Sequence, residues 1–120
     1  MENRLRVAVV GGKRSQRESL TRRMEAGNDC QVVVSVPAGR RAVALVREAQ
    51  PDLVLVWLGS PVVEALDVVQ RIVEVCPKAG VWLTGDMSTG AYTPLARRWG
   101  AQGYLDWEDL ATLPPSLRLS

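Results

Sequence analysis

The chain has 120 residues, a formal net charge of +2 and no histidine, and 47% of its residues are hydrophobic. This length suits one domain with its own core, and the lack of histidine excludes His-based catalytic triads and histidine metal ligands. No apolar run reaches the roughly 18–20 residues of a membrane span, and the charged N-terminus does not read as a signal peptide, so we expect a cytoplasmic protein.

Short apolar segments alternate with amphipathic ones along the whole chain. Segments rich in β-branched residues predict strands over residues 4–10, 30–36, 52–58, 79–84 and 102–105. Helical spacing and helix-ending glycine or proline predict helices over residues 13–28, 38–50, 61–76, 88–100 and 107–112. Pro94 disturbs the fourth helix, and Pro114-Pro115 shorten the last.

This regular alternation predicts a parallel sheet with helices on both faces. Right-handed crossovers and five strands favour a doubly wound α/β sheet of the flavodoxin-like order 2-1-3-4-5, formed by a single domain over residues 1–120. We expect Cys30 and Cys76 to be buried free thiols, because the sequence has no CxxC and no export signal.

In such a sheet, ligands bind outside the carboxyl ends of the strands, at the point where the strand order reverses. Gly11 and Gly12 follow the strand over residues 4–10, and Trp57 lies near the end of the strand over residues 52–58. Thr84 and Trp107 are expected beside them, at the ends of the next two strands. These residues define the candidate site.

The glycine pair invites a phosphate-loop interpretation, but the sequence around it matches neither the P-loop nor the GxGxxG pattern. Five basic residues lie within the eleven positions that follow the glycines: Lys13, Arg14, Arg17, Arg22 and Arg23. The first three could contact an anion or a partner at the start of a helix, and the five together form a basic face.

Four stretches together resemble the receiver domain of bacterial response regulators, most of all receivers that precede a LuxR-type DNA-binding domain: RVAVVGGKRSQRESLTRRM, PDLVLVWLGSP, VWLTGD and GAQGYLDWEDL. The resemblance covers residues 4–112. It implies the receiver fold, a switch threonine at Thr84 and a switch aromatic residue at Tyr104.

The resemblance also shows where this sequence departs from the family. Receivers hold Mg²⁺ with an acidic pair, where this chain has Gly11 and Gly12, and they phosphorylate an aspartate, where this chain has Trp57. A lysine of the family is replaced by Trp107. We expect the indole of Trp57 to fill the volume that the glycines leave.

The chemistry of the residues leads to the same interpretation without the family. A hard cation prefers carboxylate oxygens, and phosphoryl transfer to a carboxylate needs both the acceptor and a metal. The nearest acidic residues, Asp52, Asp86 and Asp106, are predicted to lie at the opposite strand end or in loops. We therefore expect no enzyme activity, no cofactor and no Mg²⁺ site.

The main hypothesis is a degenerate receiver, a pseudo-receiver, that signals through a protein partner or as a homodimer and does not accept a phosphoryl group. The alternative is a ligand-sensing domain of a transcription regulator, with a small ligand bound near Trp57 and Trp107. An open pocket between the two indoles would support the alternative. Nucleic acid would be bound only through a separate domain outside this chain.

Overall fold

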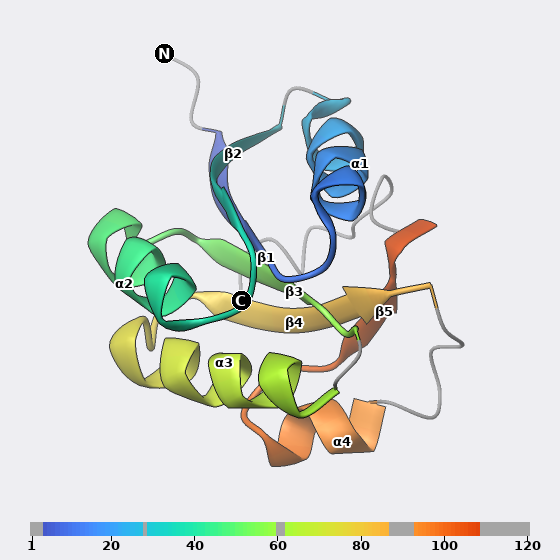
Figure 1. Cartoon of the computed structure of the whole chain (residues 1–120). Coiled ribbons are helices and arrows are strands. Elements are labelled where there is room, and N and C mark those ends of the chain that lie inside the picture. The colour runs from blue at the N-terminus through green and yellow to red at the C-terminus, as the bar shows by residue number, and fades with distance from the viewer. Residues whose placement is uncertain (1–3, 28, 60–61, 87–92, 109–120) are drawn as a thin grey trace.

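Parallel strands form one five-stranded sheet in the order β2-β1-β3-β4-β5 (Figure 1). The computed structural model describes residues 4–27, 29–59, 62–86 and 93–108. The strands are β1 (Leu5–Val10), β2 (Cys30–Val36), β3 (Leu53–Trp57), β4 (Gly80–Gly85) and β5 (Tyr104–Asp106). The predicted strand order is confirmed, with β1 and β3 as neighbours at the point where the order reverses.

Helices cover both faces of the sheet. They are α1 (Arg14–Glu25), α2 (Arg40–Ala49), α3 (Val62–Val75) and α4 (Thr93–Arg98). Leu20 and Met24 of α1 pack into the apolar cluster on one face, whereas buried residues of α2, α3 and α4 join the cluster on the other face. Figure 1 shows α1 apart from the other three helices. None of the helices in the described ranges is long and apolar enough to span a membrane.

The central strand β3 is buried along its whole length, which explains its uninterrupted apolar sequence. Its side chains alternate between the two faces. Val54 and Val56 join the cluster under α2, α3 and α4. Leu53, Leu55 and Trp57 join the cluster under α1. The last side chain of β3 therefore points to the α1 face.

The C-terminal elements differ most from the sequence prediction. The helix predicted over residues 88–100 is α4, in which Pro94 lies in the first turn, where a missing N–H costs no helical hydrogen bond. β5 begins and ends later than predicted and includes Asp106. Trp107 and Glu108 form a short 3₁₀ turn. The rest of the helix predicted over residues 107–112 lies outside the described residues.

Both cysteines are buried thiols outside any disulfide, as predicted. The Cys76 thiol lies 3.6 Å from Gln50 Oε1 and 3.9 Å from the Pro51 carbonyl oxygen. Burial raises the pKa of the Cys76 thiol; the Ala79 backbone N–H opposes this effect, and the charge of Asp52 adds to it. Cys76 therefore packs in the core between the end of α3 and the start of β3.

Candidate functional site at the carboxyl ends of the strands

The turn between β1 and α1 is built on two glycines in the left-handed region. Gly11 has a φ of 87° and Gly12 a φ of 76°, which glycine adopts without the steric cost of a Cβ atom. The Gly11 N–H donates to the Val36 carbonyl at 2.9 Å, which ties the turn to β2. The Lys13 N–H donates to Gln16 Oε1 at 2.7 Å and caps the start of α1.

Trp57 lies directly against this glycine turn. Its side chain is only 6% exposed. A Cβ atom added at Gly12 would lie 3.0 Å from Trp57 Cγ, and one added at Gly11 would lie 3.2 Å from the Trp57 carbonyl oxygen. The side chain of Trp57 thus packs against Gly12, whereas the backbone of Trp57 lies against Gly11. The sequence predicted that the indole fills the space beside both glycines, but a cavity still borders them.

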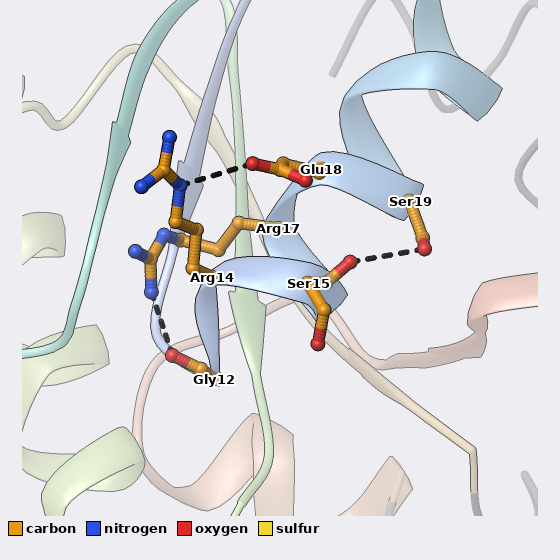
Figure 2. Close-up of polar contacts among 6 residues, drawn as sticks. All are labelled: Gly12, Arg14, Ser15, Arg17, Glu18 and Ser19. Atoms are coloured by element: carbon orange, nitrogen blue, oxygen red, sulfur yellow. Dashed lines mark hydrogen bonds and ion pairs between the residues drawn. The ribbon is translucent and has the colours of Figure 1, made fainter.

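Two of the three basic residues predicted to contact an anion or a partner make polar contacts within the start of α1 (Figure 2). Arg17 Nη1 donates to the Gly12 carbonyl at 2.7 Å and so secures the glycine turn. Arg14 Nε forms an ion pair with Glu18 at 3.0 Å. Lys13 is exposed and lines the cavity beside Trp57.

Thr84 is fully buried on the neighbouring strand. In the sheet register it lies opposite Trp57 on one side and Leu105 on the other. Its hydroxyl oxygen has no hydrogen-bond partner within the described ranges. Tyr104 is 2% exposed and packs in the cluster on the opposite face. Its hydroxyl lies over Gly85, where an added Cβ atom would come within 2.8 Å of it.

Trp107 packs against α1. The guanidinium carbon of Arg23 lies 4.4 Å from the centroid of the Trp107 ring, a cation–π contact. Arg23 Nη1 also donates to the Glu108 carbonyl at 3.0 Å. Sequence reasoning missed this role of Arg23, because nothing local links two residues so far apart in the chain.

A cavity of about 390 Å³, which we call the Trp57 cavity, opens at the carboxyl ends of β1, β2 and β3. It is bordered by the glycine turn, Lys13 and Gln16 on one side and by Trp57, Gly59 and Glu64 on another. Trp107 borders a separate hollow along α1 with Arg22 and Arg23. The two indoles join the same apolar cluster, but neither of these two cavities is bordered by both.

We compared the chain with known proteins. No family model matches it. Over 104 residues it is 24% identical to the transcriptional regulatory protein DegU of Brevibacillus brevis, covering 87% of this chain and 44% of that protein. The chain thus spans less than half the length of this curated relative.

Solved structures share the fold along almost the whole chain. The signal receiver domain of the response regulator NarL from Mycobacterium tuberculosis superposes with a TM-score of 0.77 at 23% identity, over 92% of this chain and 89% of that one. A LuxR-family response regulator from Aurantimonas sp. SI85-9A1 gives a TM-score of 0.75 at 24% identity, over 87% and 74% of the two chains. This chain has the fold of a response regulator receiver domain.

Of the three acidic residues singled out in the sequence, Asp52 lies at the opposite end of the sheet from the glycine turn. It precedes β3, and its Oδ2 accepts the Arg6 N–H at 2.9 Å. Asp86 is exposed after β4. Asp106 was predicted to lie in a loop, but it ends β5, and its Oδ1 accepts the Glu108 N–H at 3.0 Å. Within the described ranges, no three His, Cys, Asp or Glu residues gather as a metal site would require.

Proposed function

We propose that this receiver-fold domain acts in signal transduction without accepting a phosphoryl group, as a pseudo-receiver. The observation that carries the proposal is Trp57, packed against Gly11 and Gly12 at the end of the central strand. The resemblance assigns the phosphoacceptor and the metal-binding acidic pair to these three positions. All three lack a carboxylate.

The chemistry supports this interpretation. Phosphoryl transfer to a carboxylate needs that carboxylate and a cation that neutralises the developing charge. Indole carbon and nitrogen atoms supply neither an acceptor nor a ligand for a hard cation. Trp107 offers no ammonium group for a phosphoryl oxygen, and its ring is engaged by Arg23. We therefore expect no Mg²⁺-dependent phosphorylation and no enzyme activity.

Signalling without phosphorylation must proceed through contacts, and two surfaces support a protein partner or a second copy of the chain. Lys13 before α1 and Arg14 and Arg22 on α1 are exposed. Near the edge strand β5, Trp99 on the α4 face and Leu105 on the α1 face are partly exposed. We place the domain in the cytoplasm, and nucleic acid would be bound only by a separate domain. The relative DegU is a transcriptional regulatory protein of which this chain matches 44%.

Incubation with acetyl phosphate and Mg²⁺ tests the proposal, with intact mass and tryptophan fluorescence as readouts. We expect no added phosphate and no Mg²⁺-dependent change in emission, while a receiver with the complete acidic pocket, treated in parallel, gains one phosphate. A stoichiometric phosphate on this chain that is stable in acid and labile in base would overturn the proposal.

A second candidate function, sensing of a small ligand, is favoured by one observation. The Trp57 cavity lies at the switch point of the sheet, where doubly wound proteins bind ligands. Because Trp107 borders a different hollow, the candidate ligand site is the Trp57 cavity alone.

A further inference from the structure

Two opposite charges border the Trp57 cavity. Lys13 lies at the end of the glycine turn, and Glu64 lies in the first turn of α3. Both side chains are exposed, and neither forms an ion pair with another described residue. The cavity therefore offers one cation and one carboxylate that are free to meet a ligand.

Part of the wall between these charges is apolar. Pro37 and Ala38 follow β2, Ala65 belongs to α3, and Trp57 borders the same space. The volume of about 390 Å³ lies in the lower part of the range of about 300–1,000 Å³ that is typical of small-molecule sites. A planar ring can pack edge to face with the indole in such a space.

We propose that the Trp57 cavity binds a small aromatic zwitterion, an α-amino acid or a close analogue. The ligand carboxylate faces Lys13, its ammonium group faces Glu64, and its ring lies against the apolar wall. A ligand with a carboxylate alone would meet the like charge of Glu64, and one with an amine alone would meet Lys13. This inference rests on the second candidate function, ligand sensing, and is independent of phosphorylation.

Three phenyl compounds that differ in charge test the proposal: L-phenylalanine, 3-phenylpropionate and 2-phenylethylamine. Binding is measured by calorimetry and by NMR of the tryptophan indole N–H groups at neutral pH. We expect saturable binding of L-phenylalanine with a shift of the Trp57 resonance. Because an exposed ion pair contributes about 0.2–1 kcal/mol, each analogue should bind about 1.4- to fivefold more weakly.

Charge variants make the test specific. Lys13→Gln should weaken the binding of L-phenylalanine and 3-phenylpropionate but not that of 2-phenylethylamine. Glu64→Gln should weaken the binding of L-phenylalanine and 2-phenylethylamine but not that of 3-phenylpropionate. Lys78→Gln, a variant of an exposed residue that does not border the cavity, should leave all three affinities unchanged. Absence of saturable binding, or equal effects of the two variants on both analogues, would overturn the zwitterion site. Neither result would affect the phosphorylation test.

Discussion

Trp57 is a large aromatic side chain at a position where it closes the central strand and covers the glycine turn. Truncation would leave a cavity that the rigid turn cannot collapse to fill. We predict that Trp57→Ala lowers the free energy of unfolding by about 3–5 kcal/mol, measured by chemical denaturation. Val63→Ala, at a side chain that is 70% exposed, is the control and should be nearly neutral. A loss below about 1 kcal/mol at Trp57 would contradict its burial.

Thr84 carries a hydroxyl that is buried without a hydrogen-bond partner in the described ranges. Burying an unsatisfied polar group costs free energy, and an apolar side chain of the same shape removes that cost. We predict that Thr84→Val changes the free energy of unfolding by between 0 and about +1 kcal/mol. Thr84→Ser, which keeps the hydroxyl and loses a buried methyl group, should cost about 1 kcal/mol. A destabilising Thr84→Val would mean that the hydroxyl has a partner.

At the scale of elements, the β1–α1 turn depends on glycine for two separate reasons. Gly12 has a positive φ, and an added Cβ atom would come within 2.9 Å of Gln16 Oε1 and 3.0 Å of Trp57 Cγ. We predict that Gly12→Ala costs about 1–3 kcal/mol in thermal or chemical unfolding. Gly27→Ala is the matched control, because its Cβ atom would meet only Asp29 Oδ2 at 3.8 Å. Equal effects of the two substitutions would contradict a strained turn.

The contact between Arg23 and Trp107 links α1 to the end of β5. A lysine at position 107 would place an ammonium group beside the guanidinium of Arg23. We predict that Trp107→Lys lowers the free energy of unfolding more in the wild-type chain than in the Arg23→Gln variant. The coupling energy in a double-mutant cycle should be about 1 kcal/mol. Arg22→Gln, which removes an exposed neighbouring charge, is the control background and should show little coupling.

These element contacts also explain what could be predicted from sequence. Hydrophobic runs predicted all five strands, because a buried parallel strand such as β3 leaves a continuous apolar signal. Their order followed from the alternation of strands and helices and from right-handed crossovers. The packing of Trp57 on the glycine turn followed from complementary volumes. The direction of Trp107 depends on Arg23, a partner distant in sequence that leaves no local pattern. The position of Asp106 was wrong because a short edge strand has poorly marked ends.

At the scale of the whole molecule, the small net charge of +2 leaves little long-range repulsion between copies. We predict that the chain dimerises through the edge strand β5, where Leu105 is partly exposed. The mass measured by light scattering should then approach twice 13.1 kDa as concentration rises. Leu105→Glu should favour the monomer, while Val63→Glu, on α3, should not. A constant monomer mass at high concentration would contradict the prediction.

The close fit of Trp57 with Gly11 and Gly12 has an evolutionary consequence. Aspartate at position 57 alone would leave a carboxylate beside a void. A side chain at Gly11 or at Gly12 alone would strain the backbone, because both residues have a positive φ. A side chain at Gly12 would also crowd the indole. Each single substitution therefore lowers stability before an acidic pocket is complete. Because natural proteins tolerate little loss of stability, selection would remove these intermediates. The fit of Trp57 on the glycine turn thus opposes the stepwise gain of an acidic site at these three positions.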